Sequence, residues 1–170
     1  MSESPLSWMS RDVWDALIRG EDCPLCAEVQ STHAENEHGL TIADLRISRL
    51  RLARNQYVKG YCVLICRQHV REPYELSPAE RNLFFEDMCA VGVALERAFD
   101  ADKMNFEILG NAVPHLHAHI KPRYYGDPAP SRPIWVDAET VHLTADDYAA
   151  RIALIKQHLT TAQPVHPTTS

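Results

Sequence analysis

Apolar residues in the first half of the chain follow the spacing of β-strands. Within residues 42–66, Leu45 and Ile47 share one parity, whereas Leu50 and Leu52 share the other. Alternate residues of a strand face opposite sides, so a change of parity does not occur within one regular strand. The pattern therefore predicts a bulge or a tight hairpin between Ile47 and Leu50.

Further strands are indicated by short apolar runs that are bounded by turn residues. They are predicted over residues 61–66, 103–109 and 116–120, with turns at 55–60 and at Gly110-Asn111. Together with the segments on either side of the hairpin, these runs give a sheet of about five strands.

A long helix is the clearest local feature of the sequence. Residues 77–80, Ser-Pro-Ala-Glu, place serine at the N-cap, proline at N1 and glutamate at N3, which is a capping box. The helix is predicted to run over residues 78–99. Its apolar face is expected to consist of Leu83, Phe84, Met88, Val91, Leu95 and Phe99, which recur at helical spacing.

Two shorter helices are predicted towards the ends of the chain. Ser10 is expected to cap a helix over residues 11–19, which ends at Gly20. Thr144 is expected to cap an amphipathic helix over residues 145–159. These elements define an α+β fold, in which an antiparallel sheet carries the long helix on one face and has additional terminal helices. The 170 residues suit a single domain over residues 1–160, with its core at about 20–125 and a flexible tail at 161–170.

Composition excludes several classes of protein. The net charge is -6, so extended nucleic acid is not an expected partner, although a small anionic ligand is compatible with a local cluster of positive charge. No apolar run approaches the roughly 18 residues of a membrane span. The first residues lack a basic and then apolar secretory pattern, so we expect a cytoplasmic protein that does not engage a membrane.

Three of the nine histidines fall within five residues, at His115, His117 and His119. On a strand they project from one face, while the intervening Leu116, Ala118 and Ile120 point into a core. The alternative is a solvated strand face that is merely rich in histidine. Three chemistries use such a row: a metal site of a barrel hydrolase, a cupin-type metal site, and nucleophilic catalysis by imidazole. The barrel needs roughly 250 residues, and no acidic ligand follows before Asp127.

The number of cysteines is five, which is odd and therefore argues against a framework of disulfide bonds. Cys62, Cys66 and Cys89 lie in apolar surroundings and are interpreted as small packed residues. Cys23 and Cys26 instead form a C-x-x-C pair. That pair suits a tetrahedral metal site, two reduced thiols or a redox pair, and no thioredoxin-like βαβ pattern surrounds it to favour the redox role.

Residues 110–123, GNAVPHLHAHIKPR, resemble the His-φ-His-φ-His-φ-φ signature of the histidine triad superfamily, including bacterial members with a zinc knuckle. Residues 55–69, NQYVKGYCVLICRQH, resemble the block that precedes the signature in that family, and the capped helix follows at the expected place. Departures from the family pattern are Tyr61 for a histidine, Cys66-Arg67 for Pro-Lys, Asn111 for glutamine, and a shorter loop around Gly110. These departures bear on the substrate more than on the mechanism.

The resemblance implies a role for each matching residue. His117 would be the nucleophile on the α-phosphorus of a nucleotide, and His119 and Asn111 would donate hydrogen bonds to phosphate oxygens. Substrate-binding residues would be Asn55, Asn105, Asn111, His119 and Arg123. Tyr124, Tyr125 and Trp135 are candidates for stacking on a base, with ordinary loop packing as the alternative.

The resemblance also implies a metal site and an assembly. A structural zinc ion would be held by Cys23, Cys26, His69 and His115. No cofactor would be required for catalysis. A homodimer with a small-molecule nucleotide substrate is expected. The activity implied is that of a nucleotide hydrolase or nucleotidyl transferase, with dinucleoside polyphosphates such as diadenosine polyphosphates, nucleoside phosphoramidates and nucleotidyl sulfates as candidate substrates. The alternatives are a nucleotide-binding regulatory protein with vestigial catalysis, and a zinc-dependent hydrolase that uses the triad as ligands.

Overall fold

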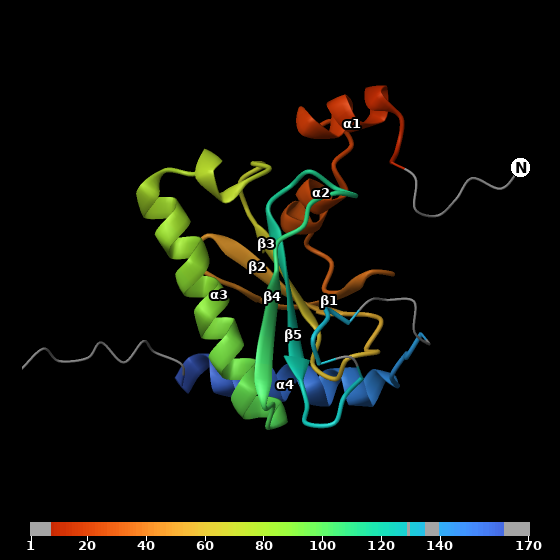
Figure 1. Ribbon diagram of the computed structural model, residues 1–170, viewed down its shortest axis with the longest axis vertical. Coiled ribbons are helices and arrows are strands. Elements are labelled where there is room, and N and C mark those ends of the chain that lie inside the picture. The colour runs from red at the N-terminus through yellow and green to blue at the C-terminus, as the bar shows by residue number, and fades with distance from the viewer. Residues whose placement is uncertain (1–7, 129, 135–139, 162–170) are drawn as a thin grey trace, which may run out of the picture.

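The computed structural model describes residues 8–128, 130–134 and 140–161 (Figure 1). Five strands form one antiparallel sheet, as the sequence pattern predicted, and their order is β1-β2-β3-β5-β4. The strands are β1 (Gly39–Asp44), β2 (Ser48–Ala53), β3 (Cys62–Cys66), β4 (Lys103–Glu107) and β5 (His117–Arg123). The helices are α1 (Arg11–Ile18), α2 (Pro24–Gln30), α3 (Pro78–Phe99) and α4 (Ala145–Thr161), with a short 3-10 turn at Pro73–Glu75.

The change of apolar parity marks a hairpin. Strands β1 and β2 pair through a tight turn in which the amide of Leu45 donates to the carbonyl of Ser48. The register also shifts between Thr41 and Ala43, so the hairpin contains an irregularity of the bulge type as well. The change of parity therefore corresponds to the tight hairpin, and the irregularity between Thr41 and Ala43 lies within β1, away from the predicted place.

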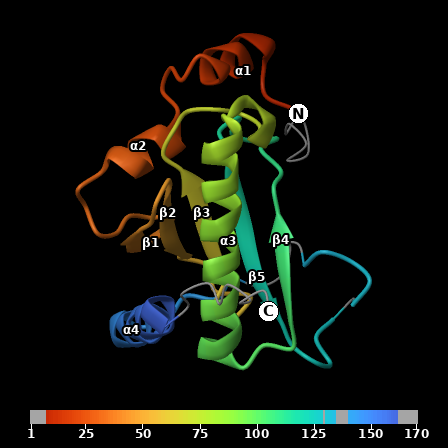
Figure 2. The ribbon, with the colours of Figure 1, turned by 90° about the vertical axis from the view of Figure 1, so that its left-hand side faces the viewer.

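Helix α3 covers one face of the sheet and lies in front of the strands in Figure 2. The Ser77 hydroxyl accepts a hydrogen bond from the Glu80 amide, and the Glu80 carboxylate accepts one from the Ser77 amide, which confirms the capping box. Phe84, Val91 and Leu95 are fully buried against the sheet. The prediction that Leu83 belongs to the apolar face is wrong, because Leu83 is 37% exposed beside the buried Phe84.

A buried carboxylate ties α3 to the β1–β2 hairpin. Asp87 is 2% exposed and accepts hydrogen bonds from the hydroxyl of Ser48 at 2.7 Å, the amide of Ile47 at 3.1 Å and Nε of Arg46 at 3.0 Å. A carboxylate with three donors is well satisfied despite its burial. This contact sets the height of the helix along the sheet and leaves the opposite face of the sheet free for other elements.

The terminal helices agree with their predicted places, with small differences. Ser10 occupies the N-cap of α1, but its side chain makes no capping hydrogen bond. The Thr144 hydroxyl does cap α4, accepting from the amide of Asp147 at 3.2 Å, and the helix continues to Thr161. Helix α2 was not predicted, because the C-x-x-C pair was interpreted only as a knuckle. The predicted tail, apart from Thr161, and Trp135 lie outside the described residues. Within the described part of the chain, no helix is both long and apolar enough to cross a membrane.

Candidate functional site

The row of three histidines divides into two sites. His117 and His119 lie on β5 and point to the face of the sheet that α3 leaves free, with ring centroids 4.9 Å apart. The intervening Leu116, Ala118 and Ile120 are buried beneath α3, as the alternation predicted. His115 precedes the strand, is fully buried, and lies within a cluster of cysteine and histidine side chains instead.

The ring of His117 is held by the main chain. Its Nδ1 lies 2.6 Å from the carbonyl oxygen of His115. A carbonyl can only accept, so Nδ1 carries the proton and donates it. Burial lowers the pKa of His117, so the ring is neutral near pH 7. A neutral ring protonated at Nδ1 has its free electron pair on Nε2, and this is the nitrogen that can act as a nucleophile.

A phenol holds the neighbouring ring. The hydroxyl of Tyr61, on the residue just before β3, lies 2.6 Å from Nδ1 of His119. Burial lowers the pKa of His119 to about 4, with the nearby His117 and Lys121 adding to the effect. Tyr61 is buried, and burial raises the pKa of its hydroxyl well above the usual range, so the phenol keeps its proton.

Both histidines line a cavity of about 630 Å³ on the free face of the sheet. Val63 and Ile65 of β3 lie in register beside His119 and His117 and form its apolar floor. Pro24 and Leu25 of α2 face it from one side and the loop 109–113 from the other. The remaining lining residues are Glu28, His38, Arg51, Ala53, Asn55, Tyr57 and Tyr61. A mostly apolar pocket with a few convergent polar groups is typical of a small-molecule site.

Two of the asparagines predicted to bind substrate also line this cavity. Asn111 is exposed and follows Gly110, whose φ of 74° turns the chain from β4 towards the histidines. Asn55 lies at the end of β2, and its Oδ1 accepts from the amides of Tyr57 and Val141. The side chain of Asn55 therefore holds the 55–60 turn to the segment before α4 while it lines the cavity.

Asn105 and Arg123 are placed elsewhere and are not among the described lining residues. Arg123 is at the far end of β5, six residues beyond His117, which is roughly 20 Å along a strand. Its guanidinium donates to the carboxylate of Asp127 at 2.6 and 2.7 Å and to Oδ1 of Asn105 at 3.0 Å. The structure thus brings these two residues to each other and away from the residues that line this cavity, and their contact with substrate stays a prediction.

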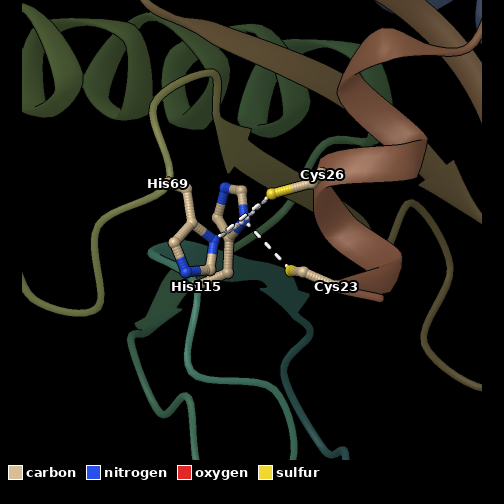
Figure 3. A group of neighbouring side chains, drawn as sticks. All are labelled: Cys23, Cys26, His69 and His115. Atoms are coloured by element: carbon tan, nitrogen blue, oxygen red, sulfur yellow. Dashed lines mark hydrogen bonds between the residues drawn. The ribbon is translucent and has the colours of Figure 1, made fainter. Parts of the chain in front are cut away.

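Four metal-ligating side chains meet in a cluster of their own (Figure 3). Cys23 and Cys26 come from the first turn of α2, His69 from the loop after β3, and His115 from the segment before β5. Their ligand atoms all lie within 4.8 Å of one another. This is the set that the resemblance implied, assembled from three separate places in the sequence.

The geometry of the cluster suits a tetrahedral ion. The Sγ atom of Cys26 lies 3.2 Å from Nδ1 of His69 and 3.5 Å from Nδ1 of His115. The Sγ atom of Cys23 lies 3.5 Å from Nδ1 of His115. The two Nδ1 atoms are 3.3 Å apart. Tetrahedral zinc with ordinary bond lengths requires edges of about 3.5 Å between nitrogen and sulfur and about 3.3 Å between two nitrogens.

The protonation of the cluster also favours a cation. Nε2 of His115 lies 2.8 Å from the carbonyl oxygen of Cys66, and Nε2 of His69 lies 3.0 Å from that of Ile18. Both Nε2 atoms must donate, so both Nδ1 atoms direct electron pairs at each other and at the thiols. Burial lowers the pKa of His115 to about 4, and burial beside Cys23 raises the pKa of Cys26 to about 11. A bound cation would relieve this concentration of donor atoms.

The sequence analysis missed three polar residues of the cavity wall. Tyr61 is one, although its place in the upstream block, where the family has histidine, marked it as a departure. Glu28 of α2 and Arg51 of β2 are the other two, and they form a buried ion pair that lines the cavity. No spacing in the sequence connects Glu28 with Arg51, because their contact depends on the unpredicted α2.

Comparison with known proteins places this architecture in a class: an open α+β sheet whose paired strand histidines face a ligand cavity. A family model described as HIT domain matches residues 35–126, more than half of the chain. The chain therefore belongs to the HIT domain family, the histidine triad proteins. No match was found among curated proteins.

Solved structures of histidine triad proteins share the fold. One from Marinobacter aquaeolei VT8 is 30% identical, with a TM-score of 0.66 over 74% of this chain and 92% of that chain. Another from Bradyrhizobium japonicum is 27% identical, with a TM-score of 0.68 over 76% and 97%. A Zn-bound histidine triad family protein from Mycobacterium smegmatis is 19% identical, with a TM-score of 0.61 over 82% and 94%, and is similar in fold.

Proposed function

We propose that this protein is a nucleotide hydrolase or nucleotidyl transferase that acts on the α-phosphate of a nucleotide conjugate through a covalent nucleotidyl-His117 intermediate. Histidine triad proteins in general bind small nucleotides and act as hydrolases or transferases. Dinucleoside polyphosphates, nucleoside phosphoramidates and nucleotidyl sulfates are the candidate substrates.

One observation carries the proposal: the hydrogen bond from Nδ1 of His117 to the carbonyl oxygen of His115. It leaves the electron pair of Nε2 free on a neutral ring that lines the cavity. A neutral imidazole is a competent nucleophile towards phosphorus, and no carboxylate is needed to orient it. A merely histidine-rich strand face would not require this fixed tautomer.

The cavity suits a nucleotide lying across the strands. Val63 and Ile65 offer an apolar floor for a base or ribose, and Leu25 of α2 faces them. At the histidine end, His119 and the side chain of Asn111 are the proposed donors to phosphate oxygens. The Glu28–Arg51 pair, which also lines the cavity, offers polar groups for the edge of a base.

The proposed reaction has two displacements. In the first, Nε2 of His117 forms a bond with the α-phosphorus, and the bond from phosphorus to the leaving group breaks. The leaving group keeps that electron pair and takes a proton from solvent. In the second, water attacks the phosphorus, the P–N bond breaks and its electron pair returns to Nε2, while the proton of water passes to solvent. Another nucleophile in place of water gives transfer instead of hydrolysis.

The test is to trap the intermediate. The protein is mixed with an adenosine or guanosine polyphosphate, phosphoramidate or sulfate, quenched at alkaline pH, and digested for mass spectrometry. We expect a nucleotidyl adduct on the peptide that contains His117. Turnover should fall by at least about a thousandfold in His117→Ala with the fold retained. Full turnover in His117→Ala would falsify the nucleophilic role.

A regulatory nucleotide-binding protein is the alternative, and one structural neighbour of 14% identity, from Bartonella henselae, is described as a Hit-like protein involved in cell-cycle regulation. Nucleotide binding without any adduct or turnover would favour it. A hydrolase that uses the triad as metal ligands is disfavoured by the division of the row, since among the described residues only His115 of the three joins the metal-ligating cluster.

For the metal we propose structural zinc bound by Cys23, Cys26, His69 and His115. The donor set, the tetrahedral spacing and the two Nε2–carbonyl hydrogen bonds support it, as does the Zn-bound relative of known structure. A closed set of four protein ligands leaves no open position for substrate, so the ion's role would be structural. The homodimer and the cytoplasmic location stay predictions, which sedimentation and fractionation can test.

A further inference from the structure

The two cavity histidines are held by opposite kinds of partner. His117 meets a carbonyl oxygen, which only accepts, whereas His119 meets the hydroxyl of Tyr61, which can donate. Both contacts involve Nδ1 and both are 2.6 Å long. The two partners therefore favour opposite protonation states of Nδ1: protonated in His117 and unprotonated in His119.

The direction of the Tyr61 hydrogen bond follows from the surroundings. Among the described residues, the Tyr61 hydroxyl has no hydrogen-bond partner other than His119. If Nδ1 of His119 donated instead, the phenol proton would lack an acceptor in a buried position, which is costly. Tyr61 is therefore the donor, and the proton of the neutral His119 ring resides on Nε2.

We propose that Tyr61 is a positioning residue, which holds His119 in the Nε2–H form and in the orientation that donates this proton to a phosphate oxygen of the substrate. The inference rests on the proposed function. It assigns a purpose to the replacement of the family's histidine by tyrosine at this position. The nucleophile thus has a bare Nε2 and its neighbour a protonated Nε2, so the two rings present complementary atoms to one phosphate group.

Buried charges hold the Tyr61 ring in turn. Lys121 is the next residue of β5 on the same face, and its Nζ lies 5.4 Å from the centroid of the Tyr61 ring. Nζ is fixed by the carboxylate of Glu107 at 2.8 Å and the carbonyl oxygen of Ile134 at 3.1 Å. Tyr57 packs edge-on against Tyr61, with ring centroids 5.5 Å apart. The phenol is thus clamped between aromatic and cationic neighbours and has little freedom to turn away from His119.

The test compares the wild type with Tyr61→Phe, with Tyr61→His as the variant that restores a donor. The ¹⁵N signals of the His119 ring are recorded by NMR in the nucleotide-free protein. In Tyr61→Phe we expect the Nδ1 signal to move because the hydrogen bond is lost, and kcat to fall about tenfold with KM changed less. Tyr61→His should recover part of kcat. Tyr74→Phe, which alters a tyrosine that is 72% exposed and does not line the cavity, is the matched control and should change neither readout.

Unchanged His119 signals in a folded Tyr61→Phe protein would overturn the inference, whatever happens to kcat. An unchanged kcat would overturn it as well, because the hydrogen bond would then be irrelevant to turnover. The NMR comparison does not depend on activity. If the wild type forms no adduct and turns over no nucleotide, the proposed function fails while the fixed ring form of His119 can still be measured.

Discussion

The carbonyl oxygen of His115 accepts the hydrogen bond that orients His117, while the ring of His115 belongs to the Cys/His cluster. One residue thus connects the candidate metal site with the candidate nucleophile. Fixing the His115 ring in the cluster also fixes the peptide that carries its carbonyl oxygen. The N-terminal segment, which supplies Cys23 and Cys26, can therefore influence the chemistry without touching the substrate.

Removing a ligand on the far side of the cluster tests this connection. His69→Ala is expected to abolish zinc binding, lower Tm by more than about 5 °C and reduce kcat, because His115 loses its anchor. Zinc content is measured by inductively coupled plasma mass spectrometry, beside thermal unfolding and turnover. His33→Ala, at an exposed histidine, is the control. A wild-type protein without zinc, or a metal-free variant of undiminished kcat, would contradict the expectation.

The pH dependence of turnover follows from the burial of the cavity histidines. Burial lowers the pKa of His119 to about 4 and also lowers the pKa of His117. The nucleophile His117 must be neutral to attack, so activity is lost as the pH falls through its lowered pKa. We expect kcat/KM to be half-maximal only below pH 6.5, whereas an ordinary histidine would give a half-maximal rate near pH 6.5. A profile half-maximal at pH 6.5 or above would exclude this arrangement.

Gly60 is required at the turn before β3. Its φ is 84°, and a Cβ atom added there would lie 2.5 Å from Cδ2 of the buried Phe99. Gly126 has the same backbone conformation, with φ at 85°, but nothing within 4 Å of an added Cβ. We expect Gly126→Ala to lower the free energy of unfolding by about 1 kcal/mol and Gly60→Ala by clearly more. Urea denaturation of both variants decides this, and equal losses would show that Phe99 yields freely.

Asp87 is expected to be essential for joining α3 to the hairpin. Asp87→Ala leaves the Ser48 hydroxyl and the Ile47 amide buried without their acceptor, so the free energy of unfolding should fall by about 3 kcal/mol. The neighbouring Glu86 is exposed on the same helix, and Glu86→Ala should stay within about 0.5 kcal/mol of the wild type. Similar losses in the two variants, measured by the same denaturation, would mean that the buried hydrogen bonds of Asp87 contribute little.

Local patterns in the sequence determine most of the fold. The capping box at Ser77 defines the start of α3, the alternation around Ala118 defines the faces of β5, and the parity change after Ile47 defines the hairpin. Each depends on residues within a few positions of one another, where spacing dictates geometry. Helix α2 and the exposure of Leu83 were not predicted, because short helices and the exact width of an apolar face depend on what packs against them.

The candidate site divides in the same way. The sequence by itself determined that His117 and His119 face away from the core, since strand alternation fixes that, whereas His115 lies before the strand and is buried in the cluster. The resemblance also implied that His115 joins Cys23 and Cys26, and the structure brings these side chains together. Only the tertiary structure decided that Tyr61 reaches His119 and that Arg123 pairs with Asn105 rather than with the cavity. These contacts join atoms from segments far apart along the chain. Their distances are set by strand register and by helix placement, which arise only when the sheet, α2 and α3 pack together.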